Sequence, residues 1–238
     1  MGPAPVAPAA DAHGVRRETG SSILNSHSLI GITELWRSHD SQAWNEALER
    51  YWKFVLPANL DLERRMESLD LERIRQLDAQ GWYDFLLNEY FRWKYTAPNR
   101  YVTTTRSLRR YTEAGTLADL ERIRERLLTF DLTDVRQGLS IAGEIKGLGT
   151  AGASGLLALM FPEAFATVDQ FVVKALRDVE ALPEAAALAK MNPEQLTGAD
   201  GVVLIDIMRR KASENNQIVG TVIWTPRKID KILWTYGR

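Results

Sequence analysis

The stretch GLGTAG, residues 147–152, has glycines at the spacing G-x-G-x-x-G, and Asp169 follows about 20 positions later. Dinucleotide-binding loops have this combination, because the glycines let a pyrophosphate approach the backbone and the acid binds a ribose hydroxyl. The same glycines also suit a tight turn between two helices that holds a DNA phosphate on backbone N–H groups. An ordinary turn between helices is the third interpretation. The flanking residues must distinguish these alternatives.

Helical periodicity flanks the glycines on both sides. Residues 132–145 and residues 171–179 each carry apolar side chains at the spacing of one helix face. A dinucleotide-binding loop must instead follow a buried β-strand, so the flanks favour a helix over 132–146, a turn, and a second helix over 150–160. The two apolar stripes are Leu132, Val135, Leu139, Ala142 and Ile145, then Phe171, Val172, Ala175, Leu176 and Val179.

The helical period continues elsewhere in the chain. Residues 117–128 are amphipathic, whereas residues 82–95 are apolar or aromatic on most faces, which is typical of a central helix. Strand patterns of period two are missing from the sequence. The short VVLI at 202–205 is best explained as part of a helix that runs to about Ser213. The sequence therefore predicts an all-α protein.

Capping residues mark the starts of two further helices. Thr225 is placed to cap a final helix with Pro226 at its first position. Asn99 is placed to cap the helix that carries Arg100 and Arg106.

Residue types restrict the available chemistry. The chain has no cysteine, which excludes disulfides, thiolate nucleophiles and cysteine-zinc sites. Its three histidines, His13, His27 and His39, all lie near the N-terminus, so a histidine metal site or a Ser-His-Asp triad would be hard to assemble. We expect no metal and no organic cofactor. Any catalysis must use carboxylates, lysine, tyrosine or backbone groups.

The charges are distributed unevenly although the formal net charge is −1. Residues 92–126 hold nine Lys or Arg against four Asp or Glu, whereas residues 39–89 hold six against eleven. One part of the chain can therefore face a polyanion while the other cannot. Solvation of helix faces is the alternative explanation for each cluster.

The composition of the N-terminal segment and the hydropathy of the chain indicate the cellular compartment of the protein. Residues 1–27 are rich in Ala, Pro, Gly and Ser without the continuous apolar centre of a secretory signal, and are expected to be a disordered tail. No run of about 18 apolar residues occurs, so we expect no membrane span. Together with the lack of cysteine, this predicts a cytoplasmic protein, nucleoid-associated in a bacterium.

The run IKGLGTAGASGLLALMFPEAFATVDQFVVKAL resembles the helix-hairpin-helix DNA glycosylase superfamily. The pattern of that family is a Leu-Pro-Gly-Val-Gly-type hairpin, an apolar helix, a short loop, and Val-Asp at the start of another helix. Residues 147–149 match the hairpin, residues 153–160 the apolar helix, and Val168 and Asp169 the catalytic acid position. The resemblance covers about residues 80–238 and is strongest at 145–176.

The resemblance implies two helical lobes with double-stranded DNA between them. One lobe would comprise residues 28–80 plus 166–238 and carry the catalytic acid, and the other, residues 81–165, would end in the hairpin. The implied DNA-binding residues are Lys146, Gly147, Gly149, Thr150, Arg100 and Arg106. A monovalent cation between hairpin carbonyls and a phosphate is compatible with the resemblance. We expect a monomer.

Asp169 is the implied catalytic residue, although an Asp at a helix start is also an ordinary N-cap. A carboxylate there can stabilise the cationic sugar that forms when a base–sugar bond breaks, and can orient the attacking water. The flipped base needs a pocket and a wedge. The family keeps these near the helix that corresponds to residues 82–95, which makes the candidates Glu89, Tyr90, Trp93, Lys94, Tyr95 and Asn99. Core packing is the alternative role for each aromatic residue.

Two positions depart from the family pattern. Lys146 replaces the proline before the first hairpin glycine and adds a candidate phosphate contact. Ala151 stands where bifunctional members have a Schiff-base lysine, so the resemblance implies a monofunctional enzyme without AP-lyase activity.

The function implied is hydrolysis of the N-glycosidic bond of a damaged or modified base, which leaves an abasic site. The base is open: oxidised, alkylated, deaminated and hypermodified phage bases all fit, and the role is DNA repair or defence against phage DNA accordingly. The alternative is a non-catalytic helix-hairpin-helix protein that binds DNA.

Overall fold

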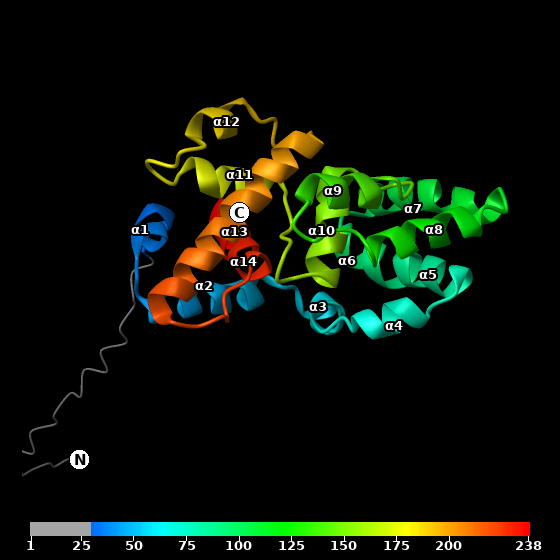
Figure 1. The fold of residues 1–238 in the computed structure, drawn as a ribbon, viewed down its shortest axis with the longest axis horizontal. Helices are drawn as coiled ribbons and strands as arrows, with labels where there is room; N and C mark the ends of the chain where they lie inside the picture. Colours follow the sequence, from blue (N-terminus) through cyan, green and yellow to red (C-terminus); the bar gives the residue numbers. More distant parts are fainter. Residues whose placement is uncertain (1–29) are drawn as a thin grey trace, which may run out of the picture. The chain divides into compact units, whose positions relative to one another are not determined.

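Helices and their connecting turns make up residues 30–238, the part of the chain that the computed structural model describes (Figure 1). No strand occurs in that range, so the all-α prediction is confirmed there. The dinucleotide-binding interpretation fails for the same reason, because it requires a strand before the glycines. The predicted tail at 1–27, with His13 and His27, lies outside the described residues.

The helices follow one another with short connections. In chain order they are α1 (Ile32–Arg37), α2 (Ser41–Phe54), a 3₁₀ turn (Pro57–Asn59), α3 (Leu60–Glu67), α4 (Leu71–Gln76), α5 (Ala79–Phe85), a π-helical segment (Leu86–Tyr90), α6 (Phe91–Lys94), α7 (Pro98–Glu113), α8 (Leu117–Leu127), α9 (Val135–Gly143), α10 (Thr150–Met160), α11 (Gln170–Arg177), α12 (Ala185–Lys190), α13 (Gly198–Val219) and α14 (Pro226–Gly237).

The C-terminal helix α14 is the centre of one group of helices and packs against α2, α11 and α13 (Figure 1). Its start is fixed as predicted, since Thr225 accepts a hydrogen bond from the N–H of Lys228 and Pro226 is the first helical residue. Ile229, Ile232 and Leu233 are fully buried. This packing brings the N-terminal helix α2 and the C-terminal helix α14 together.

A second group gathers α5 to α10, with α10 packed against α9 and α5 against α8 (Figure 1). From Gly152 to Met160 every residue of α10 is buried, because the sequence of this helix is apolar on all faces. Contacts of α9 and α10 with α13, and of α10 with α14, join the two groups.

The two lobes stay a prediction, since residues 31–238 cluster as one unit. Within that unit α3 contacts α6 and the π-helical segment, so part of the 28–80 segment lies beside the second group of helices.

Several predicted boundaries shift. The helix predicted over 132–146 begins at Val135, because Asp134 accepts the N–H of Gln137 as the N-cap, and Leu132 is left outside it and exposed. Asn99 is not a cap: α7 starts at Pro98, and Asn99 lies inside its first turn. The aromatic helix predicted over 82–95 contains the π-helical segment, which the apolar pattern did not reveal.

Other predicted elements are confirmed. The helix predicted over residues 150–160 is α10, Asp169 is the N-cap of α11, and residues 202–205 lie within α13, which continues past the predicted end near Ser213 to Val219. Between residues 30 and 238 no helix combines the length and the apolar character needed to cross a bilayer.

Candidate active site

The turn between α9 and α10 has a geometry that requires glycine at its first position. Gly147 has φ +100°, and a Cβ built on it would lie 2.6 Å from the carbonyl oxygen of Thr104. Gly149 is the N-cap of α10 in an extended conformation, with no atom within 4 Å of a built Cβ. The first N–H groups of a helix have no intrahelical partner, and no side chain within residues 30–238 caps α10, so these groups are also without a side-chain acceptor at its N-cap.

Aromatic residues from the neighbouring helices hold this turn in place. The hydroxyl of Tyr95 donates to the carbonyl of Gly147 at 3.1 Å. Tyr111 donates to the carbonyl of Glu144 at 3.2 Å and accepts the N–H of Lys146 at 3.3 Å. Tyr90, which is fully buried, donates to the carbonyl of Gly152. The turn is therefore fixed by three hydroxyl groups whose rings are packed in the interior.

Helix α10 is also tied to the segment that carries Asp169. The hydroxyl of Ser154, fully buried on α10, accepts the N–H of Val168 at 3.0 Å and donates to the carbonyl of Ala151 at 3.2 Å. On the other side of the segment, the N–H of Thr167 donates to Asp230 at 2.6 Å. Residues 167 and 168 are thus held between α10 and α14.

Asp169 is half-buried at the start of α11 and uses one oxygen as a cap. Its Oδ1 accepts the N–H groups of Phe171 at 2.9 Å and Val172 at 3.1 Å. The other oxygen has no hydrogen-bond partner among residues 30–238. Capping therefore orients the carboxylate and leaves half of its acceptor capacity for a ligand, as expected if both predicted roles coexist.

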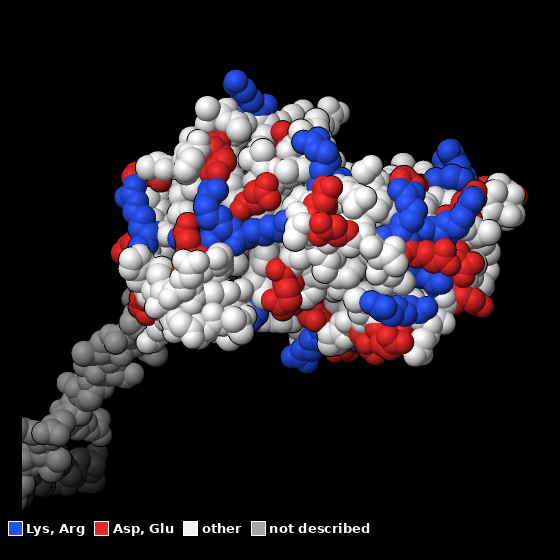
Figure 2. All heavy atoms as spheres, viewed as in Figure 1, with Lys and Arg blue, Asp and Glu red and all other residues white. Residues whose placement is uncertain are grey.

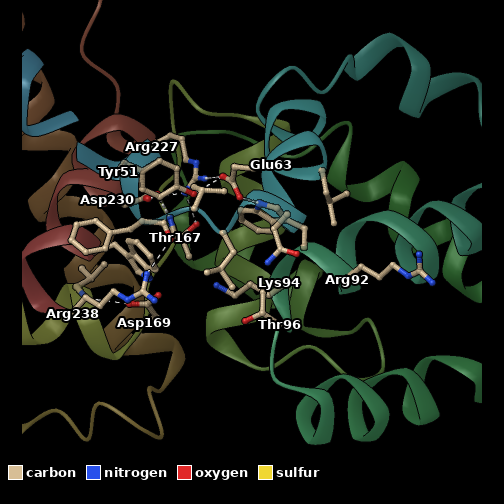
Figure 3. Close-up of a pocket in the computed structure, with 18 residues that line it drawn as sticks. Tyr51, Glu63, Arg92, Lys94, Thr96, Thr167, Asp169, Arg227, Asp230 and Arg238 are labelled. Carbon is tan, nitrogen blue, oxygen red and sulfur yellow. Dashed lines mark hydrogen bonds and ion pairs between the residues drawn. The ribbon is translucent and has the colours of Figure 1, made fainter. Parts of the chain in front are cut away.

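A cavity of about 220 Å³ lies beside Asp169, between α2, α3, α6, α11 and α14 (Figure 3). Four aromatic rings line it, together with aliphatic side chains from the 3₁₀ turn region and α3. The volume is below the range of about 300–1,000 Å³ typical of pockets for drug-sized ligands, and suits a single ring system. The aromatic lining residues are Tyr51, Phe54, Trp93 and Trp234.

A buried network of charges forms one wall of this cavity. Arg227 donates to Glu67 at 2.6 Å and to Asp230 at 2.7 Å, and Lys231 donates to Glu67 at 2.6 Å. Burial opposes ionisation of Glu67, but Arg227 and Lys231 outweigh it and lower the pKa of that carboxyl. Burial raises the pKa of Asp230 to about 7, against the opposing effect of Arg227.

The aromatic wall is anchored to the same network. Glu63 accepts the indole N–H of Trp93 at 2.7 Å and also the hydroxyl of Tyr51. Burial raises the pKa of Tyr51, with Arg227 opposing the shift, so Tyr51 remains a neutral donor. Both rings are therefore fixed in position before any ligand enters.

Lys94 is one of four basic residues that line the cavity. Figure 3 shows its side chain extending from α6 towards the side on which Asp169 lies, whereas Arg92 points away from the other labelled residues. Burial lowers the pKa of Lys94, and the charges of Asp169 and Asp230 partly offset that effect. No hydrogen bond or ion pair holds this amine within residues 30–238.

Several basic residues that form no ion pair within the described part of the chain lie on α7 and next to the glycine turn. Of the nine basic residues between 92 and 126, Arg122, Arg124 and Arg126 are in ion pairs. Exposed residues without an ion pair among the described residues are Arg92, Arg100, Arg106, Arg109 and Arg110. Lys146 is also exposed. Its amine lies 4.2 Å from the centre of the ring of Tyr111, which belongs to α7. The face drawn in Figure 2 instead mixes acidic and basic residues.

The predicted site residues divide into three sets. Asp169, Trp93 and Lys94 line the cavity together. Tyr95 donates to the carbonyl of Gly147 in the glycine turn, and Tyr90 donates to the carbonyl of Gly152 in α10. Glu89 is paired with Arg73 at 2.5 Å, and neither Glu89 nor Asn99 lines the cavity.

The residues of α2, α3 and α14 that line the cavity were not predicted from the sequence. A signal for the last was present: Arg227, Asp230, Lys231 and Trp234 follow the spacing i, i+3, i+4, i+7, which places them on one helix face. No comparable spacing marks Tyr51 or Glu63, which the fold brings in from distant parts of the sequence.

No group of three or more His, Cys, Asp or Glu side chains suited to a metal ion occurs between residues 30 and 238. Comparisons of the chain with protein-family models, curated proteins and solved structures find no match.

The two glycines of the turn between α9 and α10 allow a matched pair of substitutions. Gly147→Ala should lower the free energy of unfolding by about 1–3 kcal/mol, because the methyl group meets Thr104 and the backbone has a positive φ. Gly149→Ala should change it by less than about 0.5 kcal/mol, since the added Cβ meets open space. Urea unfolding of both variants measures this. Equal stabilities would contradict the described turn.

The raised pKa of Asp230 predicts a pH dependence of stability. The folded protein retains a proton on Asp230 up to about pH 7, whereas the unfolded chain releases it near pH 3.8. Between these values the stability due to this group falls as the pH rises, by up to about 1.4 kcal/mol per pH unit. The unfolding free energy of the protein minus that of Asp230→Asn should therefore decrease from about pH 4 to about pH 7 and then level off. A difference that stays constant over this range would show that the carboxyl is instead ionised in the folded protein.

Proposed function

We propose that this protein is a DNA glycosylase that hydrolyses the N-glycosidic bond of a damaged or modified base flipped out of duplex DNA. One observation carries the proposal. The half-buried carboxylate of Asp169, with one oxygen unpartnered, borders an aromatic cavity and is linked through Val168 and Ser154 to a glycine turn with free N–H groups. The resemblance to helix-hairpin-helix DNA glycosylases rests on the residues of this same arrangement.

The hairpin would hold the DNA backbone without reading sequence. Free N–H groups and the helix dipole at the start of α10 favour an anion, and the open space at Gly149 permits a phosphate to approach closely. Lys146 and the exposed arginines of α7, including Arg100 and Arg106, would add phosphate contacts. Contacts of this kind orient the duplex on the protein.

The cavity would receive the extruded nucleotide. Aromatic rings such as Tyr51 and Trp93 can stack on a base, and their hydrogen bonds to Glu63 fix them in advance. Because the positions are fixed, binding needs little ordering of side chains.

Asp169 would then act on the sugar. Cleavage of the base–sugar bond develops positive charge on the deoxyribose, and an adjacent carboxylate stabilises that charge. The unpartnered oxygen can also orient water or accept a proton from it. Release of the base by water requires no metal and no organic cofactor. It requires no amine at the hairpin either, where Ala151 occupies the second position of α10.

Substitution of Asp169 separates catalysis from capping. Asp169→Asn should lower the rate of base release by about 10²–10⁴-fold, because the amide cannot stabilise a cation or accept a proton. Asn caps helices about as well as Asp, so the unfolding free energy should be nearly unchanged. The assay treats duplexes and phage genomes with different base modifications with the protein, then with alkali to reveal abasic sites.

Two outcomes would contradict this role. A variant with normal base release removes Asp169 from catalysis. DNA binding with no base release from any modified duplex by the unaltered protein would favour the alternative, a non-catalytic DNA-binding protein.

The hairpin contact predicts a salt dependence of DNA binding. The logarithm of the association constant should fall steeply with the logarithm of salt concentration, and Lys146→Gln should reduce that slope by about 1. Lys190→Gln, which removes an exposed lysine of α12, is the matched control and should leave the slope unchanged. Fluorescence anisotropy with a labelled duplex measures both. An equal effect of the two substitutions would contradict a phosphate contact at the hairpin.

A further inference from the structure

Lys94 is an amine whose surroundings do not explain its presence. It lies at the end of α6 and lines the cavity, half-buried, although lysine is costly to remove from water without a partner. By contrast, the charged groups of α14 beside the cavity are paired: Arg227 with Glu67 and Asp230, and Lys231 with Glu67. Lys94 has neither an ion pair nor a hydrogen bond within residues 30–238.

Among the residues that the structure describes, the neighbours of Lys94 confine its side chain but make no hydrogen bond or ion pair with its amine. A Cβ built on Gly155 of α10 would lie 2.9 Å from the hydroxyl oxygen of Tyr90, 3.3 Å from Cδ of Lys94 and 3.4 Å from Nζ of Lys94, so the lack of a side chain at this glycine leaves room for both residues. On the other side, Nζ lies 5.9 Å from the centre of the Trp93 ring. The side chain is thus confined between α10 and the aromatic wall, and Figure 3 shows that it extends towards the side where Asp169 lies.

The protonation state also suits a nucleophile. Burial shifts the pKa of Lys94 downward, which increases the fraction of neutral amine near neutral pH, whereas Asp169 and Asp230 oppose the shift. Desolvation in a pocket is an established way to obtain a neutral lysine amine that can attack a carbonyl carbon.

We propose that Lys94 forms a Schiff base with C1′ of the abasic sugar, and so supplies from α6 the amine that Ala151 does not supply from the hairpin. The inference rests on the proposed function, because that reaction generates an abasic site beside Asp169. It also revises the expectation drawn from Ala151 that a lyase step is missing.

The chemistry balances without any further reagent. The ring-opened abasic sugar presents an aldehyde at C1′, and the neutral amine of Lys94 adds to it and expels one water molecule to form the imine. Loss of a proton from C2′ to the carboxylate of Asp169 or to solvent then breaks the bond between C3′ and its oxygen. The phosphate-bearing strand leaves, and water hydrolyses the imine to regenerate the amine.

Reductive trapping tests this inference directly. The full chain is mixed with a duplex that carries a preformed abasic site, and borohydride reduces any imine to a stable covalent adduct. The unaltered protein should give an adduct of protein plus DNA, and digestion followed by mass spectrometry should place the modification on Lys94. Lys94→Gln and Lys94→Arg should both lose the adduct, although arginine retains the positive charge.

Controls separate loss of the amine from loss of the fold or of binding. Lys174→Gln, which removes an exposed lysine of the helix that Asp169 caps, should be trapped as efficiently as the unaltered protein. Circular dichroism and anisotropy with the abasic duplex should show that the Lys94 variants fold and bind DNA. If one Lys94 variant does not fold, the site of modification in the unaltered protein decides the question.

Each result is decisive. Absence of an adduct with the unaltered protein, persistence of the adduct in a folded Lys94 variant, or modification of another lysine would overturn the inference. The abasic duplex contains no base to excise, so these results are independent of base release. Base release that persists in Lys94→Gln together with loss of trapping would support both proposals, whereas trapping without base release from any duplex would refute the proposed function alone.

Discussion

The hydrogen bond between the N–H of Val168 and the hydroxyl of Ser154 connects the two halves of the proposed site. Ser154 belongs to α10, whose N-terminus forms one side of the glycine turn, and Val168 directly precedes Asp169. Since α10 is buried from Gly152 to Met160, it is a rigid element that fixes the position of Asp169 relative to the turn. A phosphate bound at the turn would therefore be at a fixed distance from the carboxylate.

The charged network on α14 holds the segment before Asp169 from the side opposite to Ser154. Arg227 lies between Glu67 and Asp230, and Asp230 accepts the N–H of Thr167, so the segment before Asp169 is held from both sides. Burying such a network costs desolvation free energy, and its contribution to stability is consequently small. What it provides is a fixed cavity wall, in which polar groups are oriented before a ligand binds. Lys94, unpaired beside this network, stands out for that reason.

Much of the fold could be predicted because it depends on local sequence. Thr225 with Pro226, and the apolar run from residue 153 to residue 160, specify their helices through capping and periodicity alone. The N-cap at Asp134 was missed because Leu132 continued the apolar stripe into the preceding turn. The π-helical segment escaped prediction because its five residues have the same apolar pattern as an α-helix.

The site was predictable only where its residues lie close together in the sequence. Asp169 and the glycine turn belong to one continuous stretch, and both were predicted as site residues from that stretch. Tyr51 and Glu63 reach the cavity through the packing of α2 against α14 and of α3 against α6, which no local pattern encodes. Tyr90 and Tyr95 were predicted for the pocket from their helix, but their hydroxyl groups reach the hairpin carbonyls instead.

The most direct test of the account is a crystal structure of the protein with a duplex that contains a tetrahydrofuran abasic analogue. The account predicts a phosphate oxygen within about 3 Å of the N–H groups at the start of α10, with the analogue rotated out of the duplex and its C1′ facing Asp169 and Lys94. A duplex bound on another surface, or an analogue that remains outside the cavity while the phosphate occupies the turn, would contradict the coupling of hairpin and acid.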